Sequence, residues 1–335
     1  MTQKKLIQYL PGFLILVVTG ITATQIAKVS SLASPLISAV VIGVVISNAI
    51  GIPEWAKPGL ELHKLLLEIG IILLGSQIVL SQVIVAGPVI VLLTLVAVAV
   101  GALYMESISR LVFGLPSKTG SLLAAGSSIC GVSAIVSVAG SIDAEEEQIA
   151  YSVATILLFD ALTIVAFPLI GNQLDLTGKI FGVWAGLSMF STGPVAAAGF
   201  AHSGVAGQWA TLTKLVRNSF IGLVAVVYAL VYTVDTESQS KKRAVWEDFP
   251  KFIIGFLVVL SIANVGVLST GQLDLLGRIS DWLFIAAFVG LGFDIRLSEM
   301  RDAGFQPAVV VLIHLITISA LMLGIVTTIS KYGFF

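Results

Sequence analysis

The sequence predicts an all-α polytopic membrane protein, and three observations support this fold class. Hydrophobic residues make up 57% of the 335 residues, and charged residues only 11%. Mean hydropathy is +1.04, whereas about 25% of the residues in a soluble domain are charged. A helix needs roughly 20 apolar residues to cross a bilayer, and about eleven stretches of the chain approach that length. We therefore expect residues 1–335 to form a single transmembrane domain.

The predicted membrane segments follow one another along the whole chain. In order, they cover residues 10–27, 34–50, 65–82, 87–105, 119–142, 148–170, 179–202, 212–233, 251–269, 279–297 and 306–330. Lys4 and Lys5 precede the first segment, which we interpret as a transmembrane helix because hydrophobic spans continue after it. The polar loop at 234–250 separates the eighth segment from the ninth. Most of the 18 Lys and Arg residues fall on the side of the N-terminus, which predicts a cytoplasmic N-terminus and an external C-terminus.

The segment at 119–142 differs from an ordinary membrane helix. Its middle consists of small and polar residues, among them Gly126, Ser127, Ser128, Cys130, Gly131 and Ser133. Glycines allow a helix to break, and many secondary transporters build their substrate site from helices broken at the bilayer midplane. A tight contact between intact helices would have a similar composition. We favour the broken helix, because hydroxyl groups and glycines occur together in one turn.

The segment at 179–202 has the same character. Ser191, Thr192 and Gly193 precede Pro194, which lacks a backbone donor and disfavours a regular helix. Either both segments cross the membrane, giving eleven spans, or both are re-entrant hairpins beside nine spans. Hairpins would enter from opposite faces and could meet at the midplane. Only Lys179 changes side between the two arrangements, so the positive-inside rule does not distinguish them.

An internal repeat favours the hairpins. Leu74–Gly87 aligns without gaps on Leu291–Gly304, with identities at Leu74, Gly75, Ile78, Leu80, Ser81, Ala86 and Gly87. The predicted topology gives the two copies opposite orientations, as in transporters with inverted repeats. The repeat units lie around residues 65–142 and 279–330.

Charged residues within the predicted spans are candidates for function. Lys214, Arg217 and Asn218 share one helical face and are placed at the start of the eighth segment. There they would either attract an anion or extend their charges to the interface. Asp160 lies deep in the sixth segment, where a carboxylate is a functional candidate by default.

The remaining polar residues indicate structural roles. Asn48, Asn264 and His314 are expected to form hydrogen bonds between helices. The single cysteine and three scattered histidines give no metal-ligand spacing, so no metal or cofactor is predicted. No basic, aromatic-rich patch indicates nucleic acid, and Walker, dinucleotide and HExxH motifs are absent from the sequence. Asp160 and Asp294 raise a remote alternative, an intramembrane aspartyl protease, although an extra residue disrupts its GxGD spacing.

Several stretches resemble the YeiH-type sulfate exporter family of bacterial inner-membrane proteins. They are GSSICGVSAIVSVAG from Gly126, EEEQIAYSVATILLF from Glu145, LLEIGIILLGSQI from Leu66, TKLVRN from Thr213 and FVGLGFDIRL from Phe288. The resemblance covers nearly the whole chain. It implies export of sulfate or a related sulfonate from the cytoplasm. It also implies a broken-helix, inverted-repeat fold similar to that of bile acid and sodium/proton carriers, and by that analogy a homodimer.

Together, these observations predict a secondary transporter for a small anion, with the lipid bilayer as its other partner and no enzymatic activity. The predicted substrate-binding residues are Ser127, Ser128, Cys130, Gly131, Ser133, Ser191, Thr192, Gly193, Lys214, Arg217 and Asn218. Asp160 is the predicted coupling or pairing carboxylate. The alternative is a sodium- or proton-coupled carrier, either an antiporter or an importer of organic anions.

Overall fold

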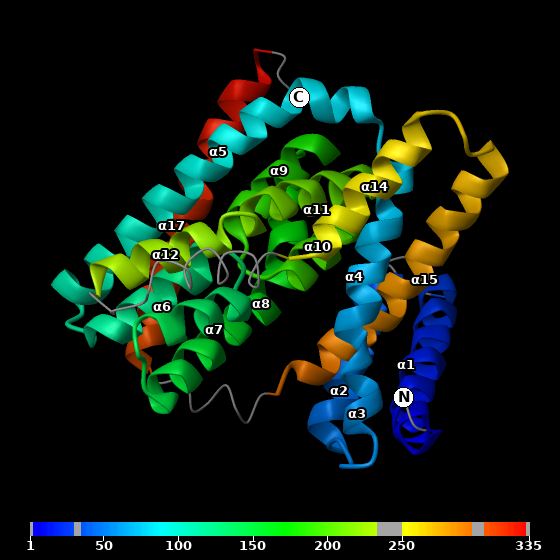
Figure 1. The fold of residues 1–335 in the computed structure, drawn as a ribbon, viewed down its shortest axis with the longest axis horizontal. Helices are drawn as coiled ribbons and strands as arrows, with labels where there is room; N and C mark the ends of the chain where they lie inside the picture. Colours follow the sequence, from blue (N-terminus) through cyan, green and yellow to red (C-terminus); the bar gives the residue numbers. More distant parts are fainter. Residues whose placement is uncertain (1–2, 30–34, 233–249, 297–304, 333–335) are drawn as a thin grey trace. The chain divides into compact units, whose positions relative to one another are not determined.

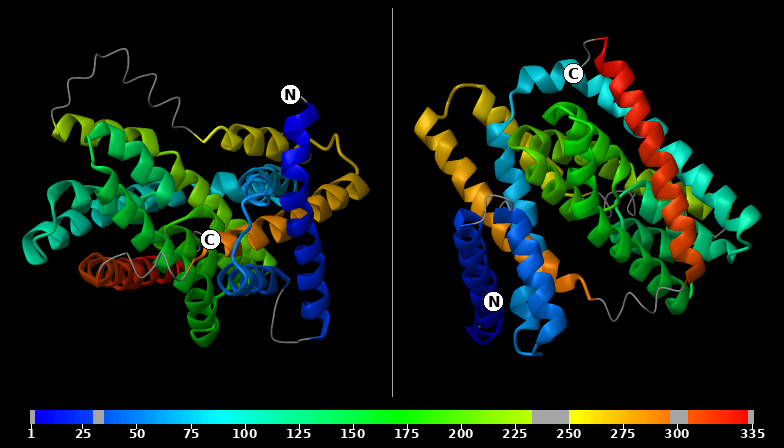
Figure 2. Two further views of the ribbon diagram at one scale, coloured as in Figure 1. Left: turned by 90° about the horizontal axis from the view of Figure 1, so that it is seen from below. Right: turned by 180° about the vertical axis from the view of Figure 1, so that it is seen from behind.

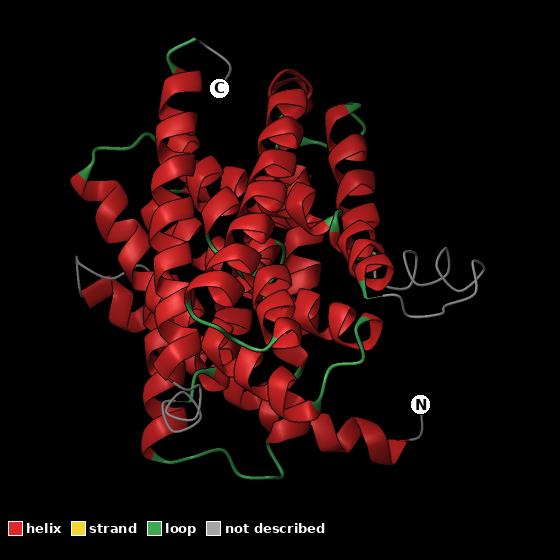
Figure 3. Cartoon of the chain, turned by 90° about the vertical axis from the view of Figure 1, so that its left-hand side faces the viewer, coloured by secondary structure: helices red, strands yellow, loops and turns green. Residues whose placement is uncertain are grey.

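The computed structural model describes residues 3–29, 35–232, 250–296 and 305–332. All regular structure within these residues is helical (Figure 3). Among the described residues, six helices are long and apolar enough to cross a membrane, and three shorter apolar helices accompany them. The predicted all-α polytopic membrane fold is therefore confirmed. The predicted loop at 234–250, except for its last residue, and residues 297–304 of the second repeat copy lie outside the described residues.

The chain divides into two compact units, and both are discontinuous in sequence. The first contains Met1–Val83 and Lys251–Ser298, and the second contains Ile84–Pro250 and Glu299–Phe335. The helices of the first unit are α1 (Gln3–Val29), α2 (Pro35–Ala49), α3 (Lys57–Leu60), α4 (Leu62–Leu74), the 3-10 turn η1 (Gly75–Gln77), α14 (Phe252–Asn264) and α15 (Thr270–Asp294). Within this unit, α15 packs against α2 and α4, and α14 packs against α4 (Figure 1).

Gly75 and Gly292, which the internal repeat aligns with each other, have equivalent roles in the first unit. A Cβ atom on Gly75 would lie 2.7 Å from the carbonyl oxygen of Phe256 in α14. A Cβ atom on Gly292 would lie 2.3 Å from the carbonyl oxygen of Val40 in α2. Each glycine thus allows one helix backbone to contact another, as small residues do at membrane helix crossings. The alignment of the two copies itself stays a prediction.

The second unit holds the broken segments. Its elements are α5 (Leu80–Ser107, from Ile84 onward), the π-helical turn η2 (Ile108–Val112), α6 (Ser117–Ser128), α7 (Val132–Ser141), α8 (Glu146–Gln173), α9 (Gly178–Ser188), α10 (Thr192–His202), α11 (Gly204–Asn218), α12 (Ile221–Val231) and α17 (Phe305–Ser330). Helices α5 and α17 lie side by side (Figure 2), joined by a 3.1 Å hydrogen bond between His314 Nε2 and the Gly101 carbonyl oxygen.

Helices α6 and α7 form a hairpin rather than a continuous span. Lys118 at the start of α6 donates a hydrogen bond to the carbonyl oxygen of Asp143, just beyond the end of α7. Closer to the break, a Cβ atom on Gly126 would lie 2.9 Å from Cγ1 of Ile135. The chain therefore returns to the side from which it entered.

Helices α9 and α10 form a second hairpin. A Cβ atom on Gly178 at the start of α9 would lie 2.8 Å from Oγ of Ser203, directly after α10. One turn further in, the rings of Phe181 and His202 stack with their centroids 4.2 Å apart. Helix α8 leads from the base of the first hairpin toward the base of the second, and its 28 residues span about 42 Å. The two hairpins consequently enter from opposite faces, which favours nine spans and two re-entrant hairpins.

Some predicted boundaries are wrong. The third predicted segment combined α4 with the start of α5, which begins at Leu80 rather than near residue 87. The tenth begins at Thr270 instead of residue 279, and the eighth begins at Gly204 instead of residue 212. In the last two cases polar residues occupy the first turns of the helix, and the apolar pattern could not detect them.

Candidate functional site

The tips of the two hairpins are in contact with each other. Ile129, Cys130 and Gly131 connect α6 to α7, and Gly131 has a φ angle of +68°, in the left-handed region that glycine adopts most readily. A Cβ atom on Gly131 would lie only 1.9 Å from Oγ of Ser191. The first tip thus requires glycine both for its backbone conformation and for its contact with the second.

The second tip connects α9 to α10 through Met189, Phe190 and Ser191. Pro194 falls in the first turn of α10, where its missing N–H is not needed for an intrahelical bond. The proline therefore lies just after the break and does not interrupt the helix. The prediction of a break before Pro194 agrees with this arrangement.

Helix lengths predict that the tips cross near the middle of the bilayer. Helix α6 has 12 residues and helix α9 has 11, so each is about 17–18 Å long. Since the two enter from opposite faces, together they roughly match a hydrocarbon core of about 30 Å. We refer to the residues where the tips meet as the hairpin crossing.

Lys214 lies at the hairpin crossing and is completely buried. Its ammonium group donates hydrogen bonds to the carbonyl oxygens of Ile129, at 2.6 Å, and Met189, at 3.0 Å. One residue of α11 thus binds backbone carbonyl groups at the tips of both hairpins.

Arg217 lies one turn further along α11 and is 2% exposed. In the first hairpin, it donates from Nε to the carbonyl oxygen of Ser128 at 2.7 Å and from Nη2 to that of Ser127. In the second, its Nη1 donates to the carbonyl oxygens of Met189, at 2.7 Å, and Gly186, at 3.3 Å. Both cations therefore occupy the C-terminal ends of α6 and α9, where the helix dipole favours positive charge.

This placement corrects the predicted position of the basic pair. The sequence placed Lys214 and Arg217 at the start of a span, within reach of the interface. Because α11 begins at Gly204, Lys214 lies nearly three turns inside the helix. Its side chain is buried against carbonyl groups and does not extend to the interface.

Asp160 of α8 is 3% exposed and binds the opposite helix end. Its Oδ1 accepts a hydrogen bond from the backbone N–H of Ser191 at 3.1 Å, next to the first turn of α10. A carboxylate is favourable there because the N-terminal end of a helix is positive. Its Oδ2 has no hydrogen-bond partner within the described residues.

Asn218 connects α11 to the start of α10. Its Nδ2 donates to Thr192 Oγ1 at 2.9 Å, while its Oδ1 is buried without a partner among the residues described. Ser191 and Thr192 are half-buried, and Ser133 at the start of α7 is exposed. Within the second unit, the crossing is therefore accessible on the side of these hydroxyl groups.

The other predicted site residues also lie at the tips, but they face inward. Ser127, Ser128, Cys130 and Gly193 are buried. Ser128 contributes its backbone carbonyl to Arg217, and its own hydroxyl is unpartnered in the described part of the chain. The predicted residues thus converge at one place, although several contribute backbone groups instead of side chains.

Comparison with known proteins identifies the family. Residues 11–311 match the family described as conserved hypothetical protein 698. The chain belongs to this family. A UPF0324 membrane protein of Nitratidesulfovibrio vulgaris is 31% identical to it over 89% of this chain and 87% of the relative. UPF0324 membrane proteins of Corynebacterium glutamicum and Brucella melitensis are each 30% identical, covering 90% and 97% of this chain and 87% and 92% of the relatives.

Two residues of this family member were not predicted to belong to the site. Phe190 is fully buried at the second tip, and its ring lies 6.4 Å from that of His314. A Cβ atom on Gly101 would lie 3.0 Å from Oγ of Ser128 and 3.5 Å from Nε2 of His314. Both His314 and Phe190 therefore lie close to the crossing. Isolated aromatic residues within apolar segments gave no signal for this position.

The three predicted interhelical hydrogen bonds are confirmed in this UPF0324-related chain. His314 bonds to Gly101, as described above. Asn48 donates to the carbonyl oxygen of Ile295, and Asn264 donates to that of Ile78. In the first unit, Oδ2 of Asp294 lies 3.3 Å from Nε2 of His63. These residues connect helices of the scaffold and lie apart from the hairpin residues in the sequence.

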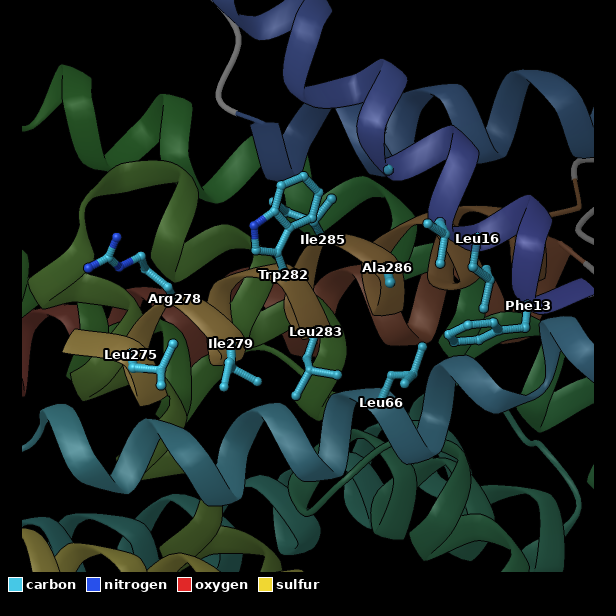
Figure 4. Close-up of a pocket in the computed structure, with 12 residues that line it drawn as sticks. Phe13, Leu16, Leu66, Leu275, Arg278, Ile279, Trp282, Leu283, Ile285 and Ala286 are labelled. Carbon is cyan, nitrogen blue, oxygen red and sulfur yellow. The ribbon is translucent and has the colours of Figure 1, made fainter. Parts of the chain in front are cut away.

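A cavity of about 440 Å³ in the first unit is chemically different from the crossing (Figure 4). Its lining is apolar apart from Arg278 and comes from α1, α4 and α15. None of the predicted site residues lines it. The polar chemistry of the predicted site is thus concentrated in the second unit.

Proposed function

We propose that this membrane protein is a secondary transporter that carries a small anion through the hairpin crossing by alternating access. It would reside in a bacterial inner membrane with its N-terminus in the cytoplasm and would perform no enzymatic reaction. The supporting observation is the net charge of the crossing. Lys214 and Arg217 are both buried there with Asp160; with all three groups ionised, the crossing carries one positive charge in excess.

The half-helix ends do not remove this excess. Each end carries roughly half a unit charge, negative for α6 and α9 and positive for α7 and α10, and these contributions cancel as a sum. An uncompensated charge at membrane depth is costly. A bound anion would supply the missing counter-charge.

Hydrogen-bond donors for an anion are available on the accessible side of the crossing. The first N–H groups of α7 and α10 have no acceptor within their own helices. The hydroxyl groups of Ser133, Ser191 and Thr192 lie beside these N–H groups in the sequence and retain exposure. Helix N-termini with adjacent hydroxyl groups are favourable surroundings for sulfonate and phosphate oxygens.

The charge balance refines the substrate class within the sulfate, sulfite and sulfonate group that the YeiH-type resemblance implies. A singly charged anion would neutralise the crossing, whereas a dianion would leave one negative charge. We therefore expect sulfonates and hydrogen sulfite to be preferred over sulfate. Export is favourable in an inside-negative cell, because each negative charge that leaves gains about 2.3 kcal/mol per 100 mV.

Flux measurements in proteoliposomes test the proposal. Purified protein would be reconstituted, and liposomes loaded with methanesulfonate, sulfite or sulfate would be assayed with and without an imposed potential. We expect potential-driven efflux, fastest for methanesulfonate, and its loss in Lys214→Ala/Arg217→Ala. Lys179→Ala is the matched control, since Lys179 is a basic residue that lies over the Trp209 ring away from the tips. Absence of flux for all three anions would reject the proposal.

A second candidate is a carrier coupled to protons or sodium at Asp160. The observation in its favour is the unpartnered Oδ2 of this buried carboxylate. This function predicts solute movement that depends on a proton or sodium gradient and is abolished by Asp160→Asn. Anion flux that persists in Asp160→Asn would rule it out.

A further inference from the structure

Two broken helices end at the hairpin crossing, and each leaves backbone carbonyl groups without intrahelical partners. At membrane depth, an unsatisfied carbonyl group costs several kcal/mol. The groups concerned belong to Ser127, Ser128 and Ile129 in the first hairpin and to Gly186 and Met189 in the second. This local concentration of oxygens requires a positively charged partner.

Metal cations are one partner that carbonyl clusters of this kind accept. Sodium and other hard cations bind backbone oxygens, and unwound carbonyls at half-helix ends coordinate coupling ions in transporters. A carbonyl cluster alone would therefore favour a cation-coupled carrier. The decisive question is which positive group binds these carbonyl oxygens.

In this chain, side chains of the single helix α11 donate hydrogen bonds to these carbonyl oxygens. Lys214 and Arg217 donate six hydrogen bonds to these carbonyl groups, and both side chains are at least 98% buried. The Met189 oxygen accepts from both residues. The cations are covalently attached to α11, so they cannot dissociate during a transport cycle.

We propose that the Lys214 ammonium and the Arg217 guanidinium replace metal cations at the hairpin crossing, so that the crossing binds no sodium or potassium. The inference builds on the proposed function by assigning its ion dependence. Transport of the anion would then be independent of sodium, and the membrane potential alone would drive it. A metal cation would bind only after the side-chain cation is removed.

Thermal unfolding of the full-length protein in detergent tests this without a substrate. The variants are Lys214→Ala and Lys214→Met. Each removes the donor to the Ile129 oxygen and one of the two donors to the Met189 oxygen. The alanine leaves space at these oxygens, whereas the methionine fills the space with an apolar chain. Each would be unfolded in sodium, potassium and choline chloride at equal ionic strength. A ligand that binds only the folded state raises Tm with its concentration.

We expect Lys214→Ala to show a Tm higher by about 2 °C or more in sodium or potassium than in choline. The wild type and Lys214→Met should show no such difference. A specific sodium or potassium effect on the wild type would overturn the proposal, and so would identical curves for Lys214→Ala in all three salts. Because the wild-type measurement alone can reject it, the test remains valid if Lys214→Ala fails to fold.

The flux assay separates this inference from the proposed function. Anion flux in the wild type that is equal in sodium and choline supports both. Anion flux that requires sodium would reject the proposal that Lys214 and Arg217 replace metal cations. The proposed function as an anion transporter would still stand. If no anion is transported while the Tm pattern above is observed, the proposed function fails and the assignment of the cations stands.

Discussion

At the scale of single residues, Gly131 is the most constrained position of the crossing. It combines a φ angle of +68° with a site where a Cβ atom would clash with Ser191. We expect Gly131→Ala to lower the free energy of unfolding by about 1–3 kcal/mol and to abolish transport by displacing the tips. Thermal unfolding and flux in proteoliposomes would measure the two effects.

Gly140 provides the matched control for this substitution. It lies in α7, the helix that follows Gly131, and a Cβ atom there would meet no atom within 4 Å. Gly140→Ala should therefore stabilise the helix by about 0.5–1 kcal/mol and leave transport intact. Equal effects of the two alanines would contradict the role assigned to Gly131.

Asp160 allows the charge of the crossing to be changed with little change in shape. The amide oxygen of Asp160→Asn can still accept from the Ser191 N–H, but the net charge rises from one positive charge to two. We expect the flux ratio of sulfate to methanesulfonate to increase by about tenfold, equivalent to ~1.4 kcal/mol. Asp294→Asn, which alters the carboxylate near His63 in the first unit, should leave the ratio unchanged. A ratio that falls in Asp160→Asn would refute the charge argument.

Residue identities predicted which residues meet at the hairpin crossing but not which of their groups make the contacts. The hydroxyl- and glycine-rich tips and the polar residues of α11 were all recognisable from their unusual chemistry within apolar segments. That Lys214 and Arg217 bind backbone carbonyl oxygens could not be predicted. Such bonds depend on where two broken helices end in space, and carbonyl groups are present at every residue.

At the scale of elements, the hairpins determine which loops share a side of the membrane. In a Cys130→Ser background, Ser117→Cys and Glu146→Cys should be labelled by an impermeant maleimide from one face. Gln173→Cys and Val205→Cys should be labelled only from the other face. All four introduced positions are exposed at the ends of helices. Opposite labelling of Ser117→Cys and Glu146→Cys would instead show that residues 119–142 cross the membrane.

Hydropathy could not separate a hairpin from a span, for a physical reason. Two antiparallel helices of about 12 and 10 residues have the same length and apolar content as one full crossing. The break is apparent only in the small residues around Cys130. What distinguishes the hairpin is a contact between distant residues, such as that of Lys118 with Asp143, which leaves no periodic signal.

At the scale of the whole molecule, the fold class followed from the low charge content, the high mean hydropathy and the lengths of the apolar stretches. The internal repeat added the expectation of opposite orientations for the two copies, which stays a prediction. The division into two discontinuous units could not be predicted. Each unit consists of two segments that are far apart in the sequence, and no change in amino-acid composition marks where one unit ends and the other begins.

Nine spans and eleven spans both predict that the two termini lie on opposite sides of the membrane. The distribution of Lys and Arg predicts that the N-terminus is inside. We expect a C-terminal alkaline phosphatase fusion to be active in a bacterial host and a C-terminal green fluorescent protein fusion to be dark. The reverse pattern would exchange the membrane faces from which the two hairpins enter.

Under the proposed function, a single excess positive charge at the crossing would also have a consequence for the transport cycle. With a singly charged anion bound, the site would be neutral, and the membrane potential would do little work on its movement. The empty site would carry the positive charge back, and an inside-negative potential would draw it toward the cytoplasm. The return step would therefore be the voltage-sensitive one, and the resting potential of the cell would reset the empty carrier for the next cytoplasmic anion.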